Sequence, residues 1–273
     1  MSASTTSPAT SSAALLDGRP ATADELAPLA FAGYAHFTAM QVRGGGVRGL
    51  DLHLERLRRA SLELFGRALP DERVLSELRA ALETGPADLS LTATVHSSAG
   101  EFTSAEGEPR LLVRTGPPSS GPAGPLALAV VEHERALPSL KHVGEVSKTY
   151  FLRQAAAQGF DDAAFLDRRG RFSEATIWNL AFWDGDAVVW PDAEMLTGTT
   201  MGVLRRQLDR LGVPQRVREV TPTDLPGFAG AVVMNSWTPG VAVRRIGSVD
   251  LPGAAPFVAL LHRAYQAEPL VAP

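Results

Sequence analysis

Two lysines stand out among the basic residues of this chain. Of its 26 basic residues only Lys141 and Lys148 are lysines, and the rest are arginines. Such a bias is typical of a chain in which arginine replaces lysine wherever the charge alone matters. An amine that forms a Schiff base is not replaceable in this way, because a guanidinium stays protonated and is not a nucleophile. One of the two lysines is therefore a candidate nucleophile, and two surface lysines without chemistry are the alternative.

Two segments have the residue types of an anion site. In HLERLRRAS, residues 53–61, Arg56 lies between two leucines of a predicted helix. An arginine there either holds a phosphate by a bidentate contact or extends to solvent. Gly198, Thr199 and Thr200 open another predicted helix. Its free N–H groups, its hydroxyls and the positive end of its dipole favour an anion, although threonine also begins helices as a cap.

Glu174 is a candidate for a functional carboxylate. Glu174 is followed by an uncharged run up to Trp183, and a carboxylate at the edge of such a run is paired, caps an element or is functional. An amine, an arginine with a helix-start anion site, and a carboxylate are together what pyridoxal phosphate needs. The amine forms the Schiff base, the anion sites hold the phosphate, and the carboxylate keeps the pyridine nitrogen protonated so that the ring accepts electrons.

Motifs from about Phe37 to Val243 extend this pattern. They are H-x-x-R-L-x-x-x-S at 53–61, GFDDA at 159–163, SEA with a following NL at 173–180, and LTGTTM at 196–201. With these motifs the chain resembles the class IV aminotransferases, the fold-type IV pyridoxal-phosphate enzymes. That family includes branched-chain and D-amino-acid aminotransferases and aminodeoxychorismate lyase.

The resemblance implies a role for each motif. The family's Schiff-base lysine lies about eighteen residues before the GFDDA-like stretch, and this spacing selects Lys141 rather than Lys148. Glu174 is then expected to face the pyridine nitrogen. The cofactor phosphate is expected to be held by Arg56, Thr199, Thr200 and Ser236.

The chain departs from the family pattern on the substrate side. Met201 replaces the usual arginine after the phosphate turn, and the usual aromatic residue a few positions after the lysine is absent. Residues 94–100 lack the arginine that often recognises a substrate carboxylate. Cofactor binding is therefore better supported than recognition of an α-carboxylate.

A few residues resemble the lyase branch of the family. Phe37, Thr38 and Asn235 are expected on the substrate side, where the lyase threonine assists proton transfer. Leu140, Lys141 and His142 also resemble that branch. The alternative for Thr38 is an ordinary strand threonine.

The resemblance implies a pyridoxal-phosphate-dependent aminotransferase that acts on a small amino acid or amine through Lys141. Its partners would be an amino donor and a keto-acid acceptor, and it would form a homodimer with the active site near the domain and subunit interfaces. The first alternative is a lyase, which needs no acceptor. A non-catalytic binding protein of the same fold is the second, and an α+β binding protein outside the family is a further one.

Hydropathy patterning predicts an α+β chain in two segments. TGPPSSGPAGP, residues 115–125, has four prolines and three glycines and fits no regular element. We therefore predict a disordered tail at 1–20, a small N-terminal α/β domain at 21–115, a linker at 116–125 and a larger C-terminal domain at 126–273. The resemblance implies that the larger domain binds the cofactor and has a barrel-like β core with helices.

Composition excludes several other classes of protein. The 273 residues include no cysteine, which rules out disulfides, zinc-thiolate sites, iron–sulfur clusters and a thiol nucleophile. We predict no metal site. A net charge of −4 gives no basic field for nucleic acid, and no apolar run is long enough to cross a bilayer. The Ser/Thr-rich start lacks the features of a signal peptide, so we expect a cytoplasmic protein.

Overall fold

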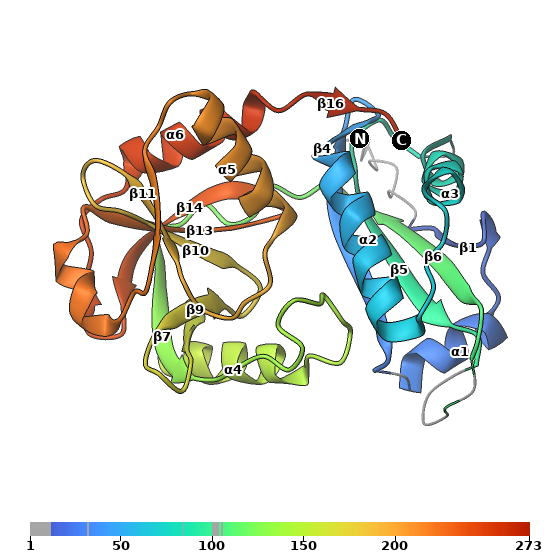
Figure 1. The fold of residues 1–273 in the computed structure, drawn as a ribbon, viewed down its shortest axis with the longest axis horizontal. Helices are drawn as coiled ribbons and strands as arrows, with labels where there is room; N and C mark the ends of the chain where they lie inside the picture. The colour runs from blue at the N-terminus through green and yellow to red at the C-terminus, as the bar shows by residue number, and fades with distance from the viewer. Residues whose placement is uncertain (1–11, 32, 84, 100–103, 105) are drawn as a thin grey trace, which may run out of the picture.

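Two β-sheets in two lobes form the protein (Figure 1). The computed structural model describes residues 12–31, 33–83, 85–99, 104 and 106–273. The first lobe is built mainly from residues before the linker at 116–125, and the second from residues after it. Helices and strands are mixed throughout, as the hydropathy patterning predicts.

The first lobe holds a seven-stranded sheet in the order β16-β4-β3-β5-β6-β1-β2. Its central strands β3, β5 and β6 alternate between a face covered by α2 and α3 and the opposite face. This alternation is the two-residue period of a strand with one buried face. The bounds are β1 Ala14–Leu16, β2 Arg19–Pro20, α1 Ala23–Phe31, β3 Ala35–Arg43, β4 Gly46–Arg48, α2 Leu50–Phe65, α3 Asp71–Glu83, β5 Leu89–Ser97 and β6 Pro109–Gly116.

The second lobe holds a sheet that closes on itself. Strands β10, β13, β14, β7, β8 and β9 pair in turn, and β9 pairs back with β10, so that six strands form a ring. Strands β11, β12 and β15 extend it. The bounds are β7 Leu126–Glu132, β8 Asp162–Leu166, β9 Phe172–Ala175, β10 Asn179–Trp183, β11 Val188–Pro191, β12 Gln215–Arg218, β13 Gly230–Asn235, β14 Thr238–Ile246 and β15 Val249–Asp250.

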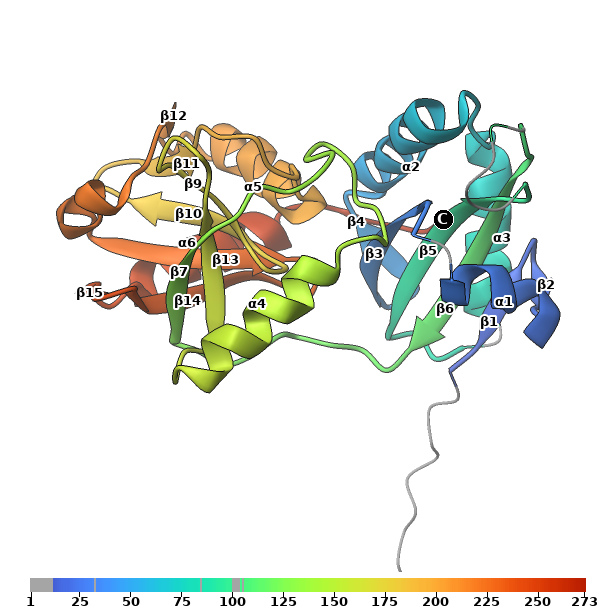
Figure 2. The ribbon, with the colours of Figure 1, turned by 90° about the horizontal axis from the view of Figure 1, so that it is seen from below.

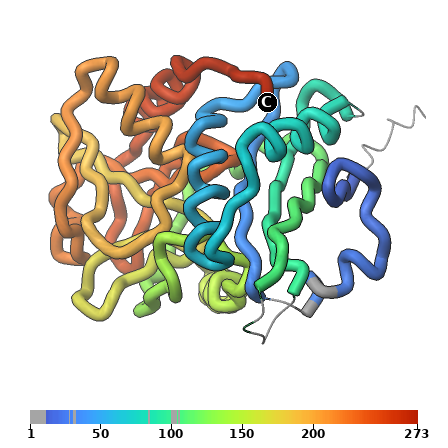
Figure 3. Tube along the Cα trace, turned by 45° about the vertical axis from the view of Figure 1, so that its right-hand side comes forward, coloured from blue at the N-terminus to red at the C-terminus, as the bar shows by residue number. Residues whose placement is uncertain are grey.

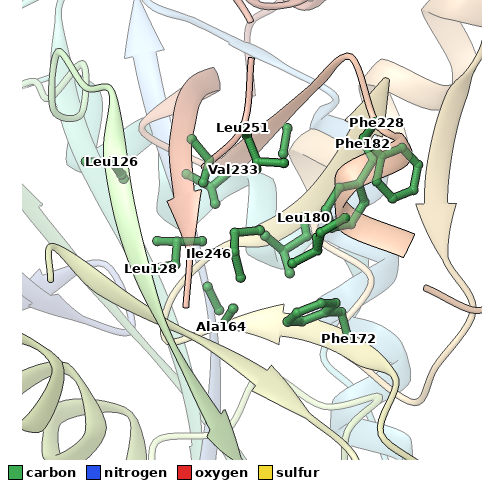
Figure 4. Close-up of a cluster of buried hydrophobic side chains, with 14 of the residues drawn as sticks. Leu126, Leu128, Ala164, Phe172, Leu180, Phe182, Phe228, Val233, Ile246 and Leu251 are labelled. Atoms are coloured by element: carbon green, nitrogen blue, oxygen red, sulfur yellow. The ribbon is translucent and has the colours of Figure 1, made fainter. Parts of the chain in front are cut away.

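Alternate residues of these strands fill the inside of the ring and face its outer helices. Leu180 and Phe182 of β10 point inward, where they pack with Val233 of β13 (Figure 4). Ala181 lies between them in sequence and packs outward against the helices. These helices are α5 Thr199–Arg210 and α6 Ala255–Gln266, while α4 Val146–Ala157 covers β7 and β8; the 3₁₀ turn η1 is Pro222–Gly227.

Helix α2 lies on the side of the first lobe that faces the second (Figures 1 and 3). It starts after Gly49, which has a φ of 67°. A Cβ at Gly49 would lie 2.5 Å from the side chain of Val203 in α5. Glycine is therefore required both by the left-handed backbone and by the close approach of the two helices. This approach brings Arg56 of α2 near the start of α5.

The chain crosses between the lobes more than once. Residues 117–125 connect β6 to β7 (Figure 2), and β16, Leu270–Val271, returns from the second lobe to pair with β4 (Figure 1). The predicted tail at 1–20 is wrong where the structure describes it, because β1 and β2 pair with β6 and with each other. Leu16 of β1 is fully buried. The rest of that prediction, at 1–11, lies outside the described residues.

Two element boundaries differ from the sequence expectation. A second strand is predicted at 47–52, but α2 already begins at Leu50. A helix is predicted from 142, but residues 142–145 are not helical and α4 begins at Val146. His142 instead forms an isolated β-bridge with His36 of β3. This bridge places the neighbouring Lys141 between the two lobes.

Candidate active site

A cavity of about 240 Å³ lies between the two lobes. Strand β3 and helix α2 line it from the first lobe through Phe37, Ala39 and Arg56. The second lobe supplies the remaining walls, among them Lys141, Lys148, Glu174, Thr199, Thr200, Asn235 and Ser236. Every site residue predicted from the sequence lines this cavity except Thr38.

Lys141 is held by backbone pairing with β3. The N–H of Phe37 donates to the carbonyl of Lys141 at 2.8 Å, and the N–H of Val143 donates to the carbonyl of Ala35 at 2.9 Å. The Lys141 amine lies 4.8 Å from the centre of the Phe37 ring, on its face. Burial, together with the charges of Arg56 and Lys148, lowers the pKa of Lys141 to about 7. A large share of this amine is therefore neutral and nucleophilic at neutral pH.

Glu174 comes from β9 and lies between two cations. Its Oε2 is 3.5 Å from Lys148 Nζ, and its Oε1 is 3.5 Å from Arg135 Nη1. The Glu174 side chain is only 5 % exposed, and among the described residues Oε1 has no hydrogen-bond donor. Arg135 also lies 3.6 Å from Glu145, which accepts a contact from His142 at 3.0 Å. The Glu174 Oε1 is therefore free to accept a hydrogen bond from a ligand in the cavity.

The part of the cavity wall at the start of α5 has the features of an anion site. Helix α5 begins at Thr199, and Gly198 supplies no side-chain cap to its first N–H groups. Arg56 Nη2 donates to the carbonyl of Thr197 at 2.8 Å, which fixes its guanidinium beside this turn. The Thr200 hydroxyl donates to the carbonyl of Asn235 at 2.8 Å, next to Ser236. N–H groups, hydroxyls and a guanidinium at one helix start suit a phosphate.

Aromatic side chains form the remaining wall. Trp178 and Trp237 contact edge to face, with ring centres 5.9 Å apart. Asp162 fixes the segment that carries Trp178, since it accepts hydrogen bonds from the Trp178 indole at 2.9 Å and from the Thr176 hydroxyl at 2.7 Å. Trp178 is 3 % exposed and Trp237 is 41 % exposed. Trp178 is therefore the buried part of this wall, and Trp237 is the part exposed to solvent.

The residues present fit pyridoxal phosphate. The cavity wall holds an anion site, a carboxylate with an unused oxygen and a partly neutral amine. These are the three groups that a phosphate, a pyridine nitrogen and an aldehyde require. Arg56, Thr199, Thr200 and Ser236 would hold the phosphate, Glu174 the ring nitrogen and Lys141 the aldehyde.

Of the three residues predicted on the substrate side, two line the cavity and Thr38 does not. Phe37 and Asn235 line the cavity, and the Asn235 Oδ1 accepts from the Trp237 N–H at 2.8 Å. Thr38 is fully buried on the opposite face of β3, where its hydroxyl lies 2.6 Å from His53 Nδ1. The structure corrects the expectation for Thr38, because successive strand residues point to opposite faces. The next cavity-facing position along β3 is Ala39, which has no hydroxyl.

The sequence reasoning missed some residues of the site. Lys148 was set aside in favour of Lys141, yet its amine enters the same cavity. Asn179 is 6 % exposed and holds the turn before α5, with its amide bonded to Gly198 and Leu196. The signal for Asn179 was its place in the SEA…NL motif. Arg135 had no signal, because its buried position follows only from the packing of the loop before α4.

Comparison with known proteins identifies a family and structures of similar fold. The family model described as amino-transferase class IV matches residues 35–246. A branched-chain aminotransferase from Thermoproteus uzoniensis has a similar structure, with a TM-score of 0.80 at 19% identity over 94% of each chain. The 4-amino-4-deoxychorismate lyase from Pseudomonas aeruginosa has a TM-score of 0.76 at 24% identity, over 92% of this chain and 97% of that one. The predicted fold-type IV architecture is thereby confirmed.

A search of curated proteins finds no match to this sequence. Within the described residues, no helix is both long enough and apolar enough to cross a membrane.

Proposed function

The chain belongs to the class IV aminotransferase family, and we propose that it is a pyridoxal-phosphate-dependent aminotransferase with Lys141 as the attachment residue. The observation that carries this proposal is the single cavity shared by Lys141, Glu174, Arg56 and the start of α5. The substrate we propose is a small amino acid or amine. A keto acid would then accept the amino group.

The chain's own residues account for the steps around the cofactor. Pyridoxal phosphate, when bound, supplies an aldehyde that condenses with amines and a ring that accepts electrons from the bond being broken. Lys141 would attach the cofactor as a neutral amine, and when free it would hold or release a proton beside the substrate carbon. Its pKa of about 7 suits both tasks, because proton transfer is most effective near the working pH. Glu174 would accept a hydrogen bond from the ring nitrogen.

The other residues of the cavity would orient the cofactor and enclose the reacting atoms. Arg56, Thr199, Thr200 and Ser236 would hold the phosphate and so orient the ring relative to Lys141. Phe37, Trp178 and Trp237 present apolar surface to the reacting atoms. This wall excludes water and favours a substrate with an apolar side chain.

Reduction of the cofactor-loaded protein with borohydride tests the attachment residue. We expect an absorbance band in the visible range after pyridoxal phosphate is added, and a reduced, cofactor-bearing peptide that contains Lys141. Lys141→Ala should lose both signals, while Lys148→Ala should keep the label on Lys141. A label found only on Lys148, or no visible band in the wild-type protein, would contradict the proposal.

A lyase is the second candidate, favoured by the similarity to the 4-amino-4-deoxychorismate lyase. The two activities differ in whether a 2-oxo acid is needed. An aminotransferase stops after one half-reaction without an acceptor and leaves the cofactor in its amine form, whereas a lyase continues. Ala39 supports the aminotransferase, since the cavity-facing position beside Phe37 has no hydroxyl to move a proton. Steady turnover of amino substrates without any acceptor would favour the lyase, and a protein that binds cofactor but turns over neither way would be a binding protein.

We also infer a homodimer. Large apolar side chains lie exposed on α4 and the loop before it, close to Lys141 and Lys148: Leu137, Val143, Val146 and Tyr150. Val146 is 82 % exposed, and such clusters mark protein interfaces more often than free surface. Sedimentation equilibrium should give twice the chain mass, and Val146→Glu should shift it toward the monomer.

A further inference from the structure

Two amines enter one cavity, although covalent attachment uses only one. Lys148 lies in the first turn of α4, and its side chain is 11 % exposed. Its Nζ is 3.5 Å from Glu174 Oε2. The other cations of the cavity have assigned tasks, because Lys141 attaches the cofactor and Arg56 lies at the phosphate end. Lys148 has no assigned task, and its amine lies beside Glu174, the proposed partner of the ring nitrogen.

We propose that Lys148 is a positioning residue that bridges the Glu174 carboxylate and the phenolate oxygen of the cofactor ring. This inference rests on the proposed function. In pyridoxal phosphate a single ring carbon separates the nitrogen from the carbon that bears the hydroxyl. Two cations contact Glu174, and of these only Lys148 lines the cavity, so Lys148 is the one that a phenolate beside the nitrogen would meet.

The charges around Glu174 support this assignment. Glu174 lies between Lys148 and Arg135 at equal distances, so one carboxylate faces two cations. Arg135 has a second partner in Glu145, whereas Lys148 has only Glu174 among the ion pairs of the described residues. Burial lowers the pKa of Lys148, while its ion-pair partner Glu174 raises it. An anionic oxygen on the ligand would add a second counter-charge beside this amine.

The side chains near Lys148 leave this role open. The class pattern has an aromatic residue a few positions after the lysine, but here Val146 has no polar group and is exposed. The phenol of Tyr150 belongs to a side chain that is 56 % exposed and does not line the cavity. Lys148 is the residue of α4 that does line it.

A chemical double-mutant cycle tests the contact. Wild type, Lys148→Met and Lys148→Arg are titrated with pyridoxal 5′-phosphate and with its 3-O-methyl ether, whose phenolate is blocked. Quenching of Trp178 and Trp237 reports binding. A charge-assisted hydrogen bond contributes about 1.5–3 kcal/mol, so the wild type should prefer the natural cofactor by about tenfold to a hundredfold. Lys148→Met should bind both compounds alike, and Lys148→Arg should restore part of the preference.

The pH midpoint of the visible absorbance band gives a second test. It should not change if Lys148 only supports the fold. A cation beside the phenolate disfavours a proton on the neighbouring imine, so Lys148→Met should raise the pH midpoint of the band. Lys148→Arg should keep a midpoint near that of the wild type.

The outcomes separate the two proposals. Unchanged preference and unchanged midpoint in Lys148→Met, with normal cofactor binding, would overturn the role of Lys148 alone. Borohydride labelling of Lys148 in the wild type would overturn it as well. Failure of the wild type to bind either compound would instead contradict the proposed function. Unfolding curves of the variants show whether a loss of binding is local, and Lys148→Gln repeats the test with a polar side chain.

Discussion

Asn179 joins strand β10 to the turn before helix α5 through both ends of its amide. Its Nδ2 donates to the carbonyl of Leu196 at 2.7 Å, and its Oδ1 accepts from the N–H of Gly198 at 3.1 Å. A Cβ at Gly198 would lie 2.1 Å from that same Oδ1. The barrel strand thus sets the position of the helix start that faces the cavity.

Asn179→Ala should weaken cofactor binding more than it weakens the fold. Each buried hydrogen bond contributes about 1 kcal/mol, so loss of both should raise the dissociation constant for pyridoxal phosphate about tenfold or more. Gly198→Ala should act in the same direction, because its methyl group displaces the Asn179 amide. Fluorescence titration measures the affinity. Asn179→Asp keeps the acceptor for Gly198 and should fall between Asn179→Ala and the wild type; equal affinities in all four proteins would contradict the prediction.

Lys141→Met should stabilise the cofactor-free protein, and more strongly at about pH 6 than at about pH 10. The pKa of Lys141 is about 7 in the folded protein, whereas the ordinary pKa of a lysine is 10.5. The unfolded chain therefore binds more protons between these values, and wild-type stability rises with pH across that window. The cost of the buried ammonium is fully present below pH 7 and is lost by about pH 10.5, so its removal helps most at low pH. Urea unfolding at both pH values measures the effect, with Lys148→Met as a second buried amine; a larger gain at high pH would contradict the assigned shift.

Thr38→Val should change stability and leave catalysis nearly intact. Thr38 is buried against His53 and does not reach the cavity, so valine removes the 2.6 Å hydrogen bond but no contact with a ligand. The loss should lower the free energy of unfolding by about 1–3 kcal/mol. Thr38→Ser keeps the hydroxyl and should recover most of it. A fall in kcat of a hundredfold or so at unchanged stability would restore the catalytic role that the sequence suggested.

Arg135→Met should destabilise the protein strongly, and Glu145→Gln should restore part of the loss. Arg135 is buried between Glu145 and Glu174, and its removal leaves two carboxylates close together without their shared cation. Breaking a buried pair in this way costs about 3–5 kcal/mol. The double variant removes one of the stranded charges. Thermal unfolding compares the single variants with the pair, and strictly additive effects would show that the two side chains do not interact.

Much of the site follows from residue type and spacing, because the cofactor constrains both. Lys141, Glu174, Arg56 and the helix start at Thr199 were all found from short motifs, and the cavity contains each of them. The strands of the second lobe were also predictable where turn residues separate apolar runs. Such signals are local, so they survive without knowledge of the packing.

What could not be predicted depends on orientation and on distant pairing. Thr38 and Phe37 are neighbours in sequence, but the faces of β3 were not known until the register with β5 was seen. Strands β1, β2 and β16 are two or three residues long and owe their existence to partners far along the chain. Lys148 was visible in the sequence, yet only the path of the loop before α4 shows that it shares a cavity with Lys141.

Strand β16 makes the edge of the first sheet out of residues more than two hundred positions away from its neighbour β4. During synthesis on the ribosome, β4 therefore stays uncovered until the whole second lobe has emerged. A nascent chain stalled within the second lobe would expose that edge to pairing with other strands, which makes late translation the stage most open to aggregation.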